Sequence, residues 1–392
     1  MKKLVLLSTL IFGMLPAMAA RKPALRVDDC LPAGNVIVER ISSDTVYVKP
    51  DLRDTKGKWF YWAMRVRGAQ GRTLVFQFNG KWVGARGPLI TTDKGKNYRY
   101  GGGKAAKSFK YTFGPDEKEV WFYECYPYLP ADWNAFLGGL DKKMYSTGIL
   151  CRSLGGKKVP RATFGRLDGQ AKHQVVITAR HHCSESVASF VMEGIAQACC
   201  AQDETGRWLR ENVELNFVPF VDYDGMIRGD QGKNRAPHDH NRDYSEFLYN
   251  ETKAVAALYA EKRPVAVIDI HNPYISGKGN EAVECPMLNP EIVQDLASEE
   301  RFTALMEQYA EGLPYKGEDN VQFGTSWNKN KNYSAGLSCR NWAMLNLQGL
   351  HLCRCFEIPF ANARGTEVNP ESARAFGRSI AKTLVEWFPT IQ

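Results

Sequence analysis

The chain has 392 residues, of which 44% are hydrophobic and 24% charged, and its formal net charge at pH 7 is +8. This length and composition are typical of a globular protein with one large core or two moderate ones, and they exclude a largely disordered chain. The lysines and arginines are scattered and form no runs. The positive charge therefore does not indicate a nucleic-acid partner, and it is compatible with attraction to acidic surfaces or substrates.

The first twenty residues have the pattern of a secretory signal peptide. Two lysines precede an apolar run over residues 4–15, and the small-residue pattern Ala17-Met18-Ala19 follows it. This run is too short to cross a bilayer, and no later apolar run reaches that length. We therefore expect an exported protein, periplasmic or secreted, with no membrane span.

The ten cysteines all lie beyond the predicted signal peptide. Their spacing contains no CxxC pair, so it supports neither a zinc ribbon nor a thioredoxin-like motif. We expect several of them to be buried free thiols, and which of them pair cannot be read from the sequence.

The hydrophobic pattern changes character along the chain. Residues 24–128 contain short segments of alternating polarity, such as "NVIVERI" and "TLVFQF", separated by turns, which is typical of a β-sandwich. After Asp132, apolar strands alternate with helical patterns, which favours an α/β fold with a mostly parallel sheet. We predict an antiparallel β-sandwich over residues 21–140 and a mixed, mostly parallel α/β domain over residues 141–392.

Histidines at two predicted strand ends and a nearby carboxylate suggest a metal site. His181 and His182 follow the apolar segment "HQVVITA", and Glu185 falls in the first turn of the next predicted helix. An H-x-x-E spacing is common by chance, and a solvated helix start would explain it equally well. His271, however, ends a second predicted strand, and two histidines with one carboxylate leave an open position for water, as in a catalytic zinc site.

Further candidate groups lie near these motifs. Glu357 follows another short apolar segment, where a carboxylate is costly unless it is paired or functional. The polar loop over residues 222–244 contains Asn241 and three arginines, which are Arg228, Arg235 and Arg242. Guanidinium groups bind carboxylates and stabilise oxyanions, although a loop of this composition is also compatible with simple solvation.

Five motifs in order carry a resemblance. The stretches "ARHHCSES", "VPFVDYDG", "HNRDY", "DIHNP" and "FEIPFAN" resemble the zinc metallocarboxypeptidase family, most closely its branch related to the cytosolic carboxypeptidases. In that branch a β-sandwich precedes the catalytic domain, and "CYPYLPADW" resembles the end of such a sandwich. Two departures stand out, because Cys183-Ser184 replaces the usual Pro-Gly and Asp222-Tyr223 replaces the usual Asn-Pro.

The resemblance implies one Zn²⁺ per chain, held by His182, Glu185 and His271, with His182 preferred to His181 because of the H-x-x-E spacing. It implies that Glu357 is the general base.

The resemblance also implies roles in substrate binding. Asn241 and Arg242 would hold the terminal carboxylate of the substrate, and Arg235 would polarise the scissile carbonyl, with Arg228 as its competitor. Tyr333 is a candidate group near the leaving residue. Arg340 is a candidate pocket cation for acidic terminal residues, although a surface arginine is an equal alternative.

These expectations describe a metalloprotease that hydrolyses the C-terminal residue of peptides, and export favours cell-wall peptides (muropeptides) as substrates. Two alternatives stay open. One is an aspartoacylase-like amidohydrolase acting on N-acyl amino acids, and the other is a catalytically silent peptide-binding protein on the same fold. The leaving residue and the oligomeric state are not predicted.

Overall fold

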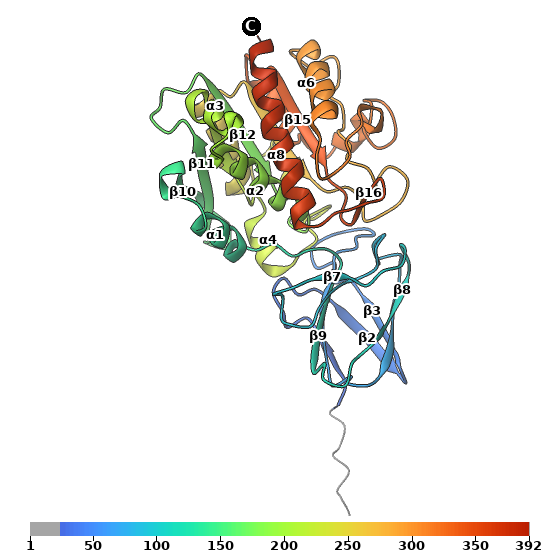
Figure 1. The fold of residues 1–392 in the computed structure, drawn as a ribbon. Helices are drawn as coiled ribbons and strands as arrows, with labels where there is room; N and C mark the ends of the chain where they lie inside the picture. The colour runs from blue at the N-terminus through green and yellow to red at the C-terminus, as the bar shows by residue number, and fades with distance from the viewer. Residues whose placement is uncertain (1–23, 392) are drawn as a thin grey trace, which may run out of the picture.

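The computed structural model describes residues 24–391, so the predicted signal peptide lies outside the described residues. Figure 1 shows two parts, a smaller β-rich part in blue and blue-green and a larger part in which helices flank a sheet. Among the described residues, no helix has both the length and the apolar character needed to cross a membrane.

The N-terminal part consists of two sheets. The first has the strand order β1 (Arg26–Asp28), β4 (Ala63–Arg67), β9 (Glu119–Tyr123), β6 (Leu89–Thr91) and β7 (Arg99–Tyr100). The second has the order β2 (Ile37–Ser42), β3 (Thr45–Lys49), β5 (Thr73–Phe78) and β8 (Ser108–Thr112). Neighbouring strands are antiparallel except β3 and β5, which run parallel.

The two sheets pack face to face. On β5, every second residue is buried, and Phe76 of this strand lies 5.3 Å from Phe122 of β9, measured between ring centroids. Alternating burial of this kind follows from the two-residue period of a strand, and the aromatic rings fill the space between the sheets. The predicted β-sandwich is confirmed.

The larger part contains a six-stranded mixed sheet. Its order is β10 (Tyr145–Arg152), β11 (Lys158–Gly165), β13 (Val213–Val218), β12 (His173–Ala179), β14 (Ala266–His271) and β15 (Leu352–Glu357). The strands β13, β12, β14 and β15 run parallel to one another. The pairs of β10 with β11 and of β11 with β13 are antiparallel. This confirms the predicted α/β fold with a mixed sheet. A two-stranded ribbon follows, formed by β16 (Asn362–Ala363) and β17 (Thr366–Glu367).

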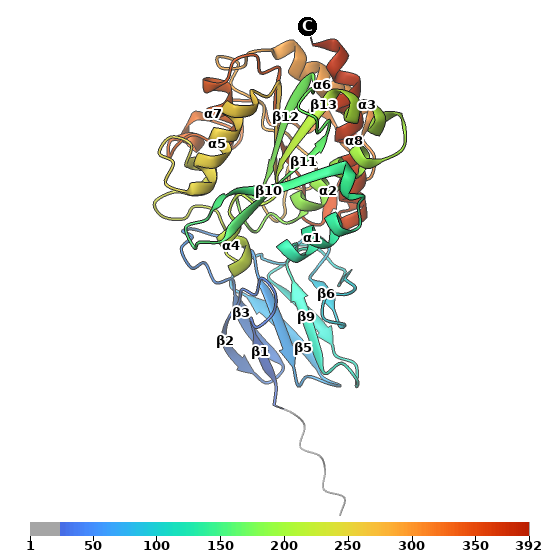
Figure 2. The same ribbon diagram turned by 90° about the vertical axis from the view of Figure 1, so that its left-hand side faces the viewer.

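Helices cover both faces of the six-stranded sheet (Figure 2). One face packs against α2 (Val187–Cys200), α3 (Glu204–Asn212) and α8 (Pro370–Trp387), and α6 (Leu296–Tyr309) lies beside α8. The other face packs against α5 (Asn250–Lys262) and α7 (Cys339–Asn346). Adjacent strand residues such as Val175 and Val176 belong to these two separate cores. Burial on both faces explains why the strands read as continuous apolar runs.

Two short helices lie near the junction of the two parts, namely α1 (Pro130–Gly138) and α4 (Tyr223–Arg228). The junction also includes the loop between β3 and β4, which reaches the α/β part. In this loop, the Phe60 ring lies 4.8 Å from Tyr274 and 5.5 Å from Phe360, and the Tyr274 hydroxyl donates to the Lys58 carbonyl at 3.1 Å. The junction is therefore packed with aromatic side chains.

The ten cysteines all lie within the described residues, and all of them are free thiols. Seven are buried, which agrees with the expectation that several act as small apolar side chains.

Candidate active site

The carboxyl ends of three adjacent parallel strands bring the predicted site residues together. His181 and His182 follow β12, His271 ends β14, and Glu357 ends β15 in register with His271. Since parallel strands end at the same edge of the sheet, residues 86 to 176 positions apart in the chain become neighbours. Glu185 joins them from the turn before α2, in which Cys183 and Ser184 donate hydrogen bonds to the carbonyls of Asp230 and Gln231.

His182, Glu185 and His271 form a compact buried cluster. The Nδ1 atom of His182 lies 2.9 Å from Glu185 Oε1, and the Nδ1 atom of His271 lies 2.7 Å from Glu185 Oε2. The ligand atoms of the three residues all lie within 4.8 Å of one another. Two imidazoles and one carboxylate that converge in this way are the donor set of a catalytic zinc site.

Two further carboxylates lie beside the imidazoles, and Asp269 is at hydrogen-bond distance from His271. Asp269 Oδ2 lies 2.8 Å from His271 Nε2, and Asp239 Oδ1 lies 3.6 Å from His182 Nε2. A carboxylate next to Nε2 favours the proton on that nitrogen and leaves the Nδ1 lone pair for a metal. The residues present therefore fit a zinc ion. Sequence reasoning missed both aspartates, although Asp269 stands two positions before His271.

His181 uses both ring nitrogens elsewhere. Its Nδ1 lies 2.9 Å from Asp269 Oδ1, and its Nε2 lies 2.7 Å from the Tyr244 hydroxyl. The trio of His181, Asp269 and His271 also lies within ligand distance. However, both nitrogens of His181 are occupied and the Asp269 carboxylate serves two histidines, so the geometry favours the His182 set.

The surroundings of Glu185 and Glu357 shift the pKa values of the two carboxyls in opposite directions. Burial alone raises the pKa of Glu185, but the adjacent His182, Lys233 and His271 outweigh this and hold its pKa well below the usual range. Burial raises the pKa of Glu357, and the cationic neighbours only partly offset that effect. A carboxylate that remains ionised suits a metal ligand, and one with a raised pKa suits proton transfer.

A pocket of about 410 Å³ lies beside this cluster. Among its lining residues are the predicted site residues His182, Asn241, Arg242, Tyr333, Arg340 and Glu357, together with Trp59, Lys233 and Tyr274. Trp59 comes from the sandwich, so both parts of the chain form the wall of the pocket.

Asn241 and Arg242 enter the pocket from a single 3₁₀ turn, η2 (His240–Arg242). Asn241 Oδ1 accepts a hydrogen bond from the Cys339 amide at 3.0 Å, and its Nδ2 lies 3.3 Å from His271 Nε2. The Arg242 guanidinium lies over the Tyr333 ring, 5.1 Å from its centroid. The neighbouring amide and guanidinium form a donor pair suited to a carboxylate.

Tyr333 and Arg340 line the same pocket. The Tyr333 hydroxyl donates to Asn328 Oδ1 at 3.0 Å. Arg340, in the first turn of α7, is 5% exposed, and its Nη1 donates to the Pro286 carbonyl. Arg340 is therefore a buried pocket residue rather than a surface arginine.

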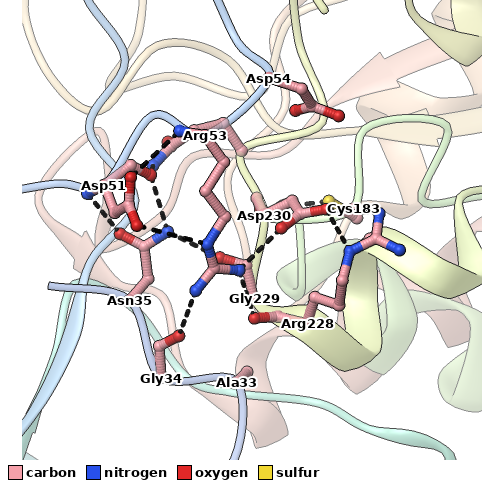
Figure 3. Close-up of polar contacts among 12 residues, drawn as sticks. Ala33, Gly34, Asn35, Asp51, Arg53, Asp54, Cys183, Arg228, Gly229 and Asp230 are labelled. Atoms are coloured by element: carbon pink, nitrogen blue, oxygen red, sulfur yellow. Dashed lines mark hydrogen bonds and ion pairs between the residues drawn. The ribbon is translucent and has the colours of Figure 1, made fainter.

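Arg235 and Arg228 do not line this pocket. Arg235 is 5% exposed and is paired with three carboxylates, at 2.6 Å from Asp222, 3.1 Å from Asp54 and 3.2 Å from Asp230. It borders a neighbouring recess instead. The Arg228 side chain is 54% exposed and pairs with Asp230 at 2.7 Å (Figure 3). Neither guanidinium is thus presented to a substrate bound beside Glu357.

Lys233, from the same loop, does line the pocket. Its Nζ lies 2.9 Å from Glu185 Oε1 and 5.2 Å from the centroid of the Trp59 ring. Sequence reasoning did not predict a role for this lysine, which stands between Arg228 and Arg235 in the chain.

A mixed α/β sheet with a buried His, Glu and His cluster and a further carboxylate at its strand ends is the arrangement of a metal-dependent hydrolase. Comparison with known proteins gives the family. Residues 140–247 match the zinc carboxypeptidase family. The chain therefore contains a zinc carboxypeptidase domain, and it is homologous to the cytosolic carboxypeptidases, which confirms the family indicated by the sequence motifs.

The similarity to characterised relatives is partial. Cytosolic carboxypeptidase 2 of Danio rerio is 26% identical over 267 residues, which cover 57% of this chain and 37% of that protein. This chain thus spans little more than a third of that relative's length.

The similarity in fold extends over nearly the whole chain. The metallo-carboxypeptidase of Burkholderia cenocepacia has a TM-score of 0.77 at 19% identity, covering 94% of this chain and 100% of that one. The metallo-carboxypeptidase of Pseudomonas aeruginosa, solved with (2-guanidinoethylmercapto)succinic acid, has a TM-score of 0.74 at 17% identity with the same coverage. Both likenesses show the fold, including a counterpart for the N-terminal part.

Proposed function

We propose that this protein is a zinc-dependent carboxypeptidase that removes the C-terminal residue of peptides. The observation that carries the proposal is that one pocket is lined by His182 of the candidate zinc cluster, by Glu357, and by the donor pair Asn241 and Arg242. A carboxypeptidase needs a hydrolytic centre and a binding group for a free carboxylate at a short fixed separation, and this pocket provides both.

The chemistry of each group follows from its surroundings. Zinc held by His182, Glu185 and His271 would supply the Lewis acid that eases deprotonation of water. Glu357, with its raised pKa, accepts the proton from the attacking water and later delivers it to the leaving amine. Asn241 and Arg242 hold the terminal carboxylate, which selects the last peptide bond for cleavage.

Arg340 supports a preference for acidic terminal residues. Its guanidinium is buried in the pocket wall, where it would pair with a second carboxylate on the leaving residue. The expected export of the chain supports cell-wall peptides as substrates, since acidic residues with free carboxylates occur in such peptides. Substrate identity and compartment are part of the proposal.

The test combines metal analysis with cleavage assays. Protein purified without chelators is analysed for zinc and incubated with a peptide panel, with muropeptides and with N-acyl amino acids, and products are detected by mass shift. We expect about one zinc per chain and loss of a single C-terminal residue. Cleavage of N-acyl amino acids alone would identify an amidohydrolase, and binding without cleavage would identify a silent binding protein.

The variant Glu357→Gln tests the assignment of the general base. The amide cannot accept a proton from water, so we expect zinc to be retained and kcat to fall by about 10³-fold or more. Glu261→Gln is the matched control, because the Glu261 side chain is 60% exposed on the surface. Turnover close to wild type in Glu357→Gln would place the general base elsewhere.

A further inference from the structure

The proposed reaction calls for a cation near the oxygen of the scissile carbonyl, and Arg235 and Arg228 do not line the pocket. Attack on a carbonyl places negative charge on that oxygen, and a donor aimed at it lowers the barrier. Arg235 is held by three carboxylates outside the pocket, and Arg228 is exposed beside Asp230. Lys233 is the residue of this loop whose ammonium group lies in the pocket next to the hydrolytic centre.

The backbone of the loop places Lys233 against the turn that carries Cys183 and Glu185. Gly232 has a φ of +83°, and a Cβ on it would lie 2.4 Å from the Cys183 amide nitrogen. The approach is therefore open only to glycine at this position. The turn that carries Glu185 grips the loop in return, since Ser184 Oγ donates to the Gln231 carbonyl at 2.8 Å and Cys183 Sγ donates to the Asp230 carbonyl at 3.1 Å.

The sandwich holds the other side of the same loop. The Gln231 side chain accepts a hydrogen bond from the Tyr61 amide and donates one to the Tyr61 carbonyl, both at 2.8 Å. Asp230 is paired with Arg53 of the sandwich, as Figure 3 shows. Trp59 packs beside the ammonium group of Lys233, which is a favourable arrangement for a cation and an aromatic face. The position of Lys233 is thus set from two directions before any substrate binds.

We propose that Lys233 is the cation that contacts the scissile carbonyl and stabilises its developing negative charge, in place of Arg235 or Arg228. The inference rests on the proposed carboxypeptidase function. An ammonium group carries three donors, and one of them is directed to Glu185 in this structure, which leaves two for a substrate oxygen. No covalent step is assigned to Lys233. It remains protonated while Glu357 moves the proton.

Kinetics of Lys233→Met and Lys233→Arg test this role. We expect Lys233→Met to lower kcat by about 10²–10³-fold with little change in KM, because the contact strengthens in the transition state. Lys233→Arg restores a cation and is expected to recover at least about tenfold of that loss. Arg228→Met is the matched control from the same loop, and we expect its kcat to stay within about twofold of wild type.

Two measurements besides activity separate this role from a structural one. The zinc content of Lys233→Met is expected to equal that of wild type, since a lysine that only neutralised Glu185 would alter metal binding. A phosphinic peptide, which carries a tetrahedral anion at the scissile position, is expected to bind Lys233→Met about 10²-fold more weakly by calorimetry, while the product amino acid binds unchanged.

The outcomes decide between the proposals. Loss of zinc in Lys233→Met, equal weakening of both ligands, or unchanged kcat would each overturn the role of Lys233 while leaving the carboxypeptidase function intact. A large loss of kcat in Arg228→Met would return the role to that arginine. Wild-type protein that cleaves no peptide would instead overturn the proposed function itself.

Discussion

Arg53 Nη1 lies 2.7 Å from Asp230 Oδ1, and this ion pair joins the β-sandwich to the loop that carries Lys233. The Asp230 side chain is 2% exposed, and its other oxygen faces Arg228 and Arg235. Arg53 also donates to the carbonyls of Gly34 and Arg228, and Asn35 donates to the carbonyl of Gly229 (Figure 3). The loop is therefore fastened to the sandwich by charge and by backbone contacts together.

Removing this ion pair should affect both stability and catalysis. We expect Arg53→Ala to lower the free energy of unfolding by about 1–2 kcal/mol, between the values for exposed and buried pairs. Because the loop positions Lys233, kcat/KM should fall by about 3–30-fold without loss of zinc. Chemical denaturation and steady-state kinetics measure the two effects. Arg72→Ala removes an exposed pair within the sandwich and should change neither by a comparable amount.

Metal content should depend on the imidazoles of the cluster. We expect His271→Ala to lose zinc and hydrolysis together, because two protein ligands are too few for a stable site. His351→Ala is a matched control, since His351 pairs with Asp295 and the side chain is 27% exposed. Atomic absorption after gel filtration measures bound zinc. Retention of a full equivalent in His271→Ala would contradict the assigned ligand set.

Specificity should depend on Arg340. We expect Arg340→Ala to lower kcat/KM for peptides ending in Glu or Asp by about 10–100-fold, on the scale of a lost charge-assisted hydrogen bond. Peptides with neutral termini should be little affected, and this comparison also controls for the bond that Arg340 donates to Pro286. Equal losses on both kinds of peptide would remove Arg340 from the recognition of the leaving residue.

A buried carboxyl in the core should make stability depend on pH. Burial raises the pKa of Glu124 from 4.5 to about 8, and neither of its oxygens has a hydrogen-bond partner among the described residues. Between these values the folded protein holds a proton that the unfolded chain releases. The contribution of Glu124 to stability is therefore present below about pH 4.5 and is lost as pH rises towards 8.

Glu124→Gln removes this titration. The stability of the variant relative to wild type should increase between pH 5 and 8 by up to about 4 kcal/mol, since one pKa unit corresponds to about 1.4 kcal/mol. Urea denaturation at several pH values measures the difference, in which the titrations of other groups cancel. A difference that stays constant across this range would show that Glu124 does not titrate there.

The sequence predicted the elements whose pattern is local. Alternating polarity indicated the sandwich, and continuous apolar runs followed by His182, His271 and Glu357 indicated buried strands with polar ends. These positions follow from the rule that parallel strands end at one edge, so the sheet itself brings the three side chains together. The parallel pairing of β3 with β5 had no such signal.

The loop over residues 222–244 was harder to interpret, because its geometry depends on distant partners. Arg235 matched the family motif in sequence, yet Asp222, Asp230 and Asp54 hold it outside the pocket. Lys233 reaches the pocket only because Gly232 packs against Cys183 and because Trp59 arrives from another part of the chain. Contacts of this kind have no periodicity, so no local pattern reveals them.

Trp59 and Tyr274 form adjoining walls of the pocket, one from the sandwich and one from the α/β part, with ring centroids 6.0 Å apart. Because a side chain of the sandwich lines the pocket, its entrance is shaped by both parts of the chain. Substitutions in the sandwich alone can therefore alter which peptides enter.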